Sequence, residues 1–330
     1  MLHTADDFLT AITAQPTDRT LRLVYADWLD ERADPRAELV RVEEEMRELP
    51  VFGDRFWELK PRRNELRALA GAEWCGRLRY GTECEPVFRH GIPDGWRERW
   101  RLIREFTERW HRVPMGDVGG RQFEIFQPQH GVGRTLPPSV WEWVTFARDA
   151  GAGESSRGLQ SEDYLSCHDE FEAIALQMET DWSGYSYSAV RYEDLGQPDP
   201  PLYSYLVGFG SSTPGWRGDV PCPTSAFFLW HVLDYFANNR WGVGGPPGGT
   251  FHSSLDQPDD ELARRLSAAF PVQVQFMSCE MYEADNILVR LDSISLWVQV
   301  FKPLDPAQIP DFLWPYARAA SHKSGMFRAV

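Results

Sequence analysis

The sequence predicts an α+β fold, with an N-terminal helical module and a small β tail, followed by a mostly antiparallel sheet with flanking helices. Apolar residues recur at the helical period over the first 70 residues. Aromatic and β-branched runs that are typical of strands occupy much of the chain after residue 180. Helices first, then strands mixed with helices, are typical of the α+β class. We place the two modules at residues 1–115 and 116–330.

The most informative run lies at residues 21–32, in a fully helical context. Its 3.6-residue period predicts one buried stripe made of Leu21, Val24, Tyr25, Trp28 and Leu29. Upstream, Thr4 and Asp7 have the spacing of a capping box and predict the start of a shorter helix. Further helices are predicted as far as residue 70, with a break at Pro61 because proline lacks an amide donor.

Residues 6–43, with the runs DDFLTAI, LRLVYADWLDER and RAELVRVE, resemble the bacterial repeat-companion domain. Residues 85–92 are similar to the usual tail of that domain, an aromatic-bearing strand followed by a turn at Arg89–Gly91. A helix is predicted at residues 96–110, and the glycines at 116–120 mark the end of the module. The companion domain has no reaction attached to it, so this resemblance implies no chemistry.

The second half is predicted to mix strands and helices. Expected helices lie at residues 138–151, 225–238, 259–269 and 310–320, and expected strands at 122–125, 185–193, 202–209, 272–278, 286–292 and 294–302. The pair Asp292–Ser293 between the last two strands predicts a hairpin turn. Residues 242–257 are predicted to form an internal loop because they are rich in glycine and proline.

Three motifs between residues 130 and 240 resemble the SUKH superfamily, which includes bacterial toxin-immunity proteins and fungal cell-wall regulators. They are GRTLPPSVWEW at 133–143, YEDLGQPDPPLY at 192–203 and TSAFFL at 224–229. The resemblance implies immunity or regulation by the binding of another protein.

The charge distribution narrows the class of partner. The net charge is −15, and residues 126–330 carry 25 acidic against 13 basic side chains. An acidic half of this size disfavours nucleic acid, because phosphate backbones are bound through Lys and Arg. It suits a basic protein partner by electrostatic steering, and solubility is the simpler interpretation of the same charge.

The sequence also predicts a cytoplasmic location. No charged and apolar signal-peptide pattern opens the chain, and no apolar run approaches the ~20 residues that a membrane helix needs. The five cysteines form no CxxC pair, which favours reduced thiols.

Residues that could carry catalysis are few and scattered. Cys167 and His168 are adjacent, but neighbours in a strand point to opposite faces, which argues against a working pair. His231 and Asp234 could touch on one helix, although a buried histidine with a carboxylate partner explains them more simply. The eight histidines show no metal-ligand spacing, so we expect no metal and no cofactor.

Aromatic residues of the second half supply the candidate contacts for a partner. The candidate set is Trp182, Tyr185, Asp199, Tyr203, Trp216, Arg217 and Asp219. Most of them lie in two glycine-flanked loops, and exposed aromatics with arginine are enriched at protein interfaces. The alternative is that the tryptophans close one end of a core.

Taken together, these patterns favour a non-enzymatic protein-binding module, with the acidic second half as the contact surface. Two alternatives stay open. One is a hydrolase-type enzyme with a dispersed site around Cys167 and His168 or around His231. The other is a scaffold that docks paralogous repeat proteins.

Overall fold

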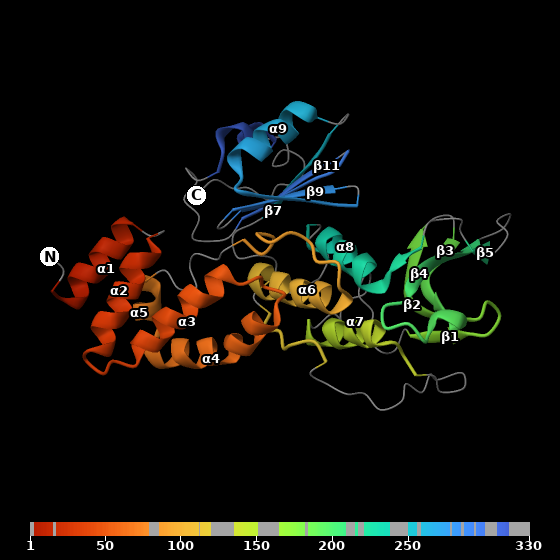
Figure 1. Cartoon of the computed structure of the whole chain (residues 1–330). Helices are drawn as coiled ribbons and strands as arrows, with labels where there is room; N and C mark the ends of the chain where they lie inside the picture. Colours follow the sequence, from red (N-terminus) through yellow and green to blue (C-terminus); the bar gives the residue numbers. More distant parts are fainter. Residues whose placement is uncertain are drawn as a thin grey trace.

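The computed structural model confirms the α+β class. It describes residues 3–15, 18–78, 86–111, 113–119, 135–150, 165–181, 184–208, 215–216, 221–237, 250–255, 259–277, 279–284, 287–293, 295–300 and 309–316. In Figure 1, N-terminal helices lead into a central helical layer, and the described strands form two antiparallel sheets at different sides of that layer.

The N-terminal helices begin where the sequence supplies caps. They are α1 (Ala5–Ala14), α2 (Arg19–Asp30), α3 (Arg36–Glu48), α4 (Asp54–Ala70) and α5 (Ala72–Arg77). The Thr4 hydroxyl accepts from the Asp7 amide while the Asp7 carboxylate accepts from the Thr4 amide, so the predicted capping box is confirmed. The Asp18 carboxylate caps α2 by accepting from the Leu21 amide.

The buried face of α2 is centred on a charged residue, which the apolar pattern did not predict. Val24 is 47% exposed, so its predicted burial was wrong, and Arg22 is fully buried instead. The Arg22 guanidinium donates to the Leu78 carbonyl at 3.0 Å and lies 3.6 Å from the Glu44 carboxylate. These two partners compensate the cost of burying a charge.

The predicted break at Pro61 was also wrong, because α4 continues through it. Ion pairs hold the helix on both sides of the proline. The Lys60 ammonium lies 2.9 Å from the Glu105 carboxylate, and the Arg62 guanidinium lies 2.7 Å from that of Glu38. Tertiary contacts of this kind override the local preference of proline.

Two further segments differ from the prediction. A turn at residues 87–90 takes the place of the strand predicted for the β tail, because the Phe88 amide donates to a side chain, the Glu283 carboxylate, at 3.0 Å. Residues 250–254, predicted to be loop, form strand β7 (Thr250–Ser254), since this run of β-prone residues pairs with another strand. Residues 122–125 and 242–249 lie outside the described residues.

The central layer consists of α6 (Trp96–His111), α7 (Pro138–Asp149) and α8 (Thr224–Ala237), which confirms three predicted helices. Trp143 and Phe228 stack at 3.7 Å between α7 and α8, and both are buried. One hydrophobic cluster extends from Phe8 in α1 to Leu288 near the other end of the chain. The core is therefore continuous across the position where we placed the module boundary.

The first sheet contains β1 (Ser166–His168), β2 (Ala173–Asp181), β3 (Gly184–Arg191), β4 (Pro201–Gly208) and β5 (Gly215–Trp216), in that order, and β6 (Cys222–Pro223) also pairs with β4. Side chains alternate between the two faces of a strand. Ile174, Val190 and Leu202 are buried in the main core on one face. The other face is the one that carries the candidate site.

The second sheet has the order β7-β11-β10-β9-β8, with β8 (Val272–Phe276), β9 (Cys279–Ala284), β10 (Ile287–Leu291) and β11 (Ser295–Val300). The predicted hairpin turn is confirmed, since the Asp292 amide donates to the Ser295 carbonyl at 3.0 Å. Helix α9 (Asp260–Ala269) covers one face through Leu262 and Leu266. The other face turns toward α8.

A buried polar group joins the second sheet to the helices. The fully buried Glu283 carboxylate accepts from the Phe88 amide and the Trp110 indole at 3.0 Å each, and the Arg109 guanidinium lies 3.4 Å away. Burial raises the pKa of Glu283, while Arg109 acts in the opposite direction.

Among the described residues, no helix is long and apolar enough to cross a membrane.

Candidate functional site

The outer face of the first sheet carries aromatic side chains around one arginine. The aromatic face, as we name it, comprises His168, Phe171, Tyr187, Arg191, Tyr203, Tyr205 and Trp216. The strand register brings them together, because Tyr187 lies opposite Tyr205 and Tyr205 lies opposite Trp216. Cross-strand aromatic neighbours of this kind stabilise each other and form one continuous surface.

Phe171 occupies the centre of the aromatic face. Its ring stacks on Tyr205 at 4.1 Å and on His168 at 4.5 Å. The residues of the sheet in the same buried cluster are small, namely Ala173, Ala175 and Ala189. Each is at most 1% exposed. Larger side chains at these positions would compete with the phenyl ring for space in a closely packed cluster.

A strained residue follows Phe171 in the turn between β1 and β2. Glu172 has a φ of 51°, in the left-handed backbone region that residues other than glycine rarely adopt. Its carbonyl accepts from the Tyr192 amide at 2.8 Å, which fixes the turn. Such conformations cost on the order of 1–3 kcal/mol and cluster at functional sites.

Arg191 is the basic member of the aromatic face. Its guanidinium lies 4.2 Å from the ring centre of Tyr203 and 4.7 Å from that of Trp216. The side chain is 33% exposed, and its Nη1 is 3.4 Å from the Glu193 carboxylate. Two rings thus hold the guanidinium in place, and part of it stays open to a partner.

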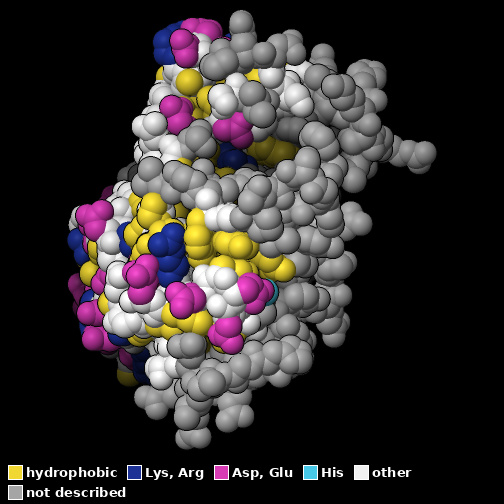
Figure 2. Space-filling view, turned by 90° about the vertical axis from the view of Figure 1, so that its right-hand side faces the viewer, with side chains coloured by type: hydrophobic (Ala, Val, Ile, Leu, Met, Phe, Trp, Pro, Cys, Tyr) yellow, Lys and Arg dark blue, Asp and Glu magenta, His cyan; other side chains and the backbone are white. Residues whose placement is uncertain are grey.

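Carboxylates border the aromatic face at two turns. The acidic rim, as we name it, consists of the exposed residues Asp169, Glu170, Glu172 and Glu193. Figure 2, which looks at this side of the molecule, shows a yellow surface interrupted by dark blue and bordered by magenta. Hydrogen bonds from its own amide and from His168 lower the pKa of Glu170.

The structure places two predicted contact residues, Tyr203 and Trp216, on the aromatic face, where their rings lie 5.8 Å apart. Four others fall outside what the structure describes, either wholly or in their side chain: Trp182, Tyr185, Arg217 and Asp219. Sequence reasoning missed Phe171, Tyr187, Arg191 and Tyr205. Alternation of tyrosine and serine in SYS at 186–188 and YSY at 203–205 was the signal for one aromatic sheet face.

Asp199, the remaining predicted contact, joins helices. Its side chain is 10% exposed and lies 3.1 Å from the Arg99 guanidinium. Its other oxygen accepts from the Ser225 amide at 2.9 Å, at the start of α8. The carboxylate therefore caps α8 and fixes it to α6.

Cys167 and His168 point to opposite faces of β1. His168 belongs to the aromatic face, whereas Cys167 packs against the main core. Cys167 neighbours Tyr192, and burial, together with Cys167 and Asp169, raises the pKa of Tyr192 to about 12. The strand geometry keeps the thiol and the imidazole apart, as the sequence predicted.

His231 is fully buried in α8 among aromatic rings. The Phe227 ring stacks on it at 5.8 Å, and Trp143 meets it edge-on at 6.2 Å. The side chain of Asp234 lies outside the described part of the chain. His231 is therefore part of the core in the described part of the chain.

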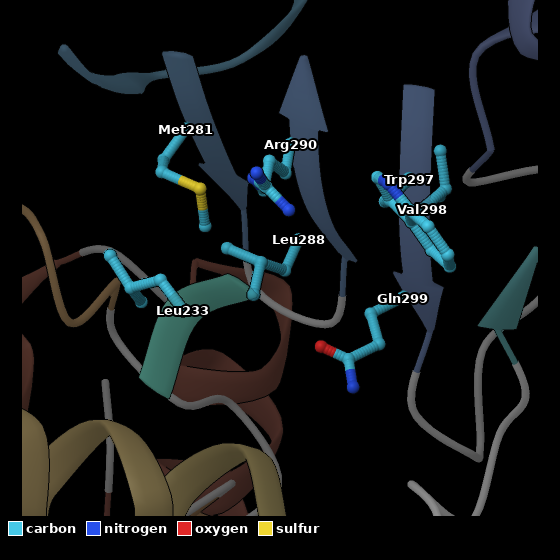
Figure 3. Close-up of a pocket in the computed structure, with 7 residues that line it drawn as sticks. All are labelled: Leu233, Met281, Leu288, Arg290, Trp297, Val298 and Gln299. Atoms are coloured by element: carbon cyan, nitrogen blue, oxygen red, sulfur yellow. The ribbon is translucent and has the colours of Figure 1, made fainter. Parts of the chain in front are cut away.

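A small cavity lies between α8 and the second sheet. The residues that line it are Leu233, Met281, Leu288, Arg290, Trp297, Val298 and Gln299 (Figure 3). Its volume is about 10 Å³. That is the space of roughly one water molecule. Within the described ranges, no group of three or more His, Cys, Asp or Glu side chains could hold a metal ion.

Comparisons with known proteins give no relative. No family model matches the chain, and neither the curated proteins nor the solved structures contain a match. A functional proposal therefore depends on the aromatic face and its acidic rim.

Proposed function

We propose that this chain is a protein-binding module and that the aromatic face is its contact surface. The observation that carries the proposal is a sheet with two unlike faces: one buries aliphatic side chains in the main core, and the other carries the aromatic rings. Tyr187, Tyr203, Tyr205 and Trp216 stay partly exposed around a fixed arginine. Tyrosine, tryptophan and arginine are the residues that dominate binding energy at protein interfaces.

For the biological role we propose immunity or regulation by binding, as the SUKH resemblance implies. The acidic rim supports a protein partner over nucleic acid, because phosphate groups would meet carboxylates at this surface. A cytoplasmic location belongs to the same proposal. It is supported by Cys75 and Cys222, which are free thiols.

A capture experiment in the native cells tests the proposal. Tagged wild-type protein is compared with Arg191→Ala, and bound proteins are quantified by mass spectrometry. The matched control is Arg264→Ala on α9, another arginine paired with a nearby glutamate, which is 70% exposed. Because the Arg191 guanidinium holds the Tyr203 and Trp216 rings in place, we expect at least one partner to be lost about tenfold with Arg191→Ala and retained with the control.

The melting temperatures of both variants are compared with that of the wild type, so that a loss of binding is not a loss of folding. If every captured protein binds Arg191→Ala as well as it binds the wild type, the aromatic face is not the contact surface and the proposal fails.

A further inference from the structure

The charges around the aromatic face define the chemistry of its partner. The rim residues Glu170 and Glu193 are 69% and 72% exposed, and Asp169 and Glu172 are exposed as well. Arg191 is the basic member of the site, and it is already held by two rings and by Glu193. An incoming side chain therefore meets aromatic rings with a negative border.

We propose that the aromatic face binds a basic segment of another polypeptide, with arginine side chains laid against its rings. This inference rests on the proposed function and adds the chemistry of the partner. A guanidinium is planar, stacks on aromatic faces and pairs with carboxylates. Arg191 already shows this geometry here, since its guanidinium lies 4.2 Å from the Tyr203 ring and 3.4 Å from the Glu193 carboxylate.

The same charges argue against other occupants. A second copy of this chain would place one acidic rim against another, and juxtaposed like charges disfavour an interface. A single-stranded nucleic acid could stack its bases on the rings, but its phosphates need a positively charged groove. A basic polypeptide can stack its arginine side chains on the rings and pair them with the carboxylates of the acidic rim.

Charge steering gives the binding a kinetic signature. Opposite charges accelerate association by about 10- to 1000-fold at low salt, and added salt removes this gain while dissociation changes little. For a basic segment, we expect the association rate constant to fall about tenfold when sodium chloride is raised from low to high concentration.

Selection from a random peptide library displayed on phage tests the proposal, with the full chain as immobilised target. We expect the selected peptides to be enriched in arginine together with aromatic residues. Their binding should weaken at least tenfold in Glu170→Lys/Glu193→Lys. The matched control is Glu38→Lys/Glu65→Lys, which reverses two carboxylates of similar exposure, 49% and 65%, that pair with Arg62. The control should bind as the wild type does.

The outcomes separate the two proposals. Selected peptides that lose binding with Arg191→Ala but are acidic or neutral would overturn the basic partner and leave the proposed function standing. Selected peptides that bind Arg191→Ala and the rim variant as tightly as the wild type would overturn both. A library that yields no binder above an unrelated protein target would overturn the inference of a short basic segment, and the capture of a folded partner would then decide the proposed function.

Discussion

Replacing Phe171 with alanine should remove the ring on which the aromatic face is assembled. Phe171 is 9% exposed, and it stacks on Tyr205 and His168. Truncation of a buried phenylalanine costs about 3–5 kcal/mol of unfolding free energy. The small side chains of Ala173, Ala175 and Ala189 cannot fill the space that the ring leaves, so a cavity remains, but water can enter it from the exposed side of the sheet. We therefore expect the lower end of the range, about 3 kcal/mol.

Urea unfolding followed by fluorescence measures this change as a shift of the midpoint at constant slope. Phe171→Leu is the matched control, because it keeps most of the volume and loses only the ring stacking. We expect that variant to cost about 1 kcal/mol. A midpoint of Phe171→Ala within error of the wild type would refute the packing role that we assign to this ring.

Three further predictions concern the core. Burial raises the pKa of Glu283 above its ordinary value of 4.5, so the folded state holds this proton more tightly than the unfolded state does. The free energy of unfolding should therefore fall as pH rises from 4.5 through the raised pKa. Glu283→Gln should flatten this part of the pH–stability curve. Arg104→Ala should cost about 3–5 kcal/mol in urea unfolding, because it leaves the Glu142 carboxylate, 2.6 Å away and 8% exposed, without its buried partner. Tyr25→Ala should lower the thermal midpoint more than Trp28→Ala does, since Tyr25 is fully buried and Trp28 is only partly buried; an equal loss would contradict this order.

Local sequence signals predicted where helices and turns form better than they predicted which distant residues those elements contact. Capping residues, helical periodicity and the Asp292–Ser293 turn located helices and a hairpin correctly, because each depends on contacts within a few residues. The buried face of α2 was misjudged because Arg22 is buried by groups far along the chain, Glu44 and Leu78. Strand β7 was missed because its formation depends on pairing with β11.

The candidate site was predicted only in part, for a similar reason. Trp216 was selected as an aromatic residue in a glycine-flanked loop, and Tyr203 belongs to the motif at residues 192–203. Phe171 stands alone in the sequence, and its position depends on the left-handed backbone at Glu172 and on small residues in β2 and β3. Arg191 becomes a contact residue only when the β3–β4–β5 register brings two rings beneath it.

Site-specific photo-cross-linking tests the central claim most directly. A benzoylphenylalanine at position 187 replaces a half-buried tyrosine of the aromatic face, and the same group at position 264 on α9 serves as the control. Irradiation in the native cells should give a covalent adduct with a partner protein from position 187 and none of that adduct from position 264. An adduct formed equally at both positions, or only at position 264, would contradict the assignment of the aromatic face as the contact surface.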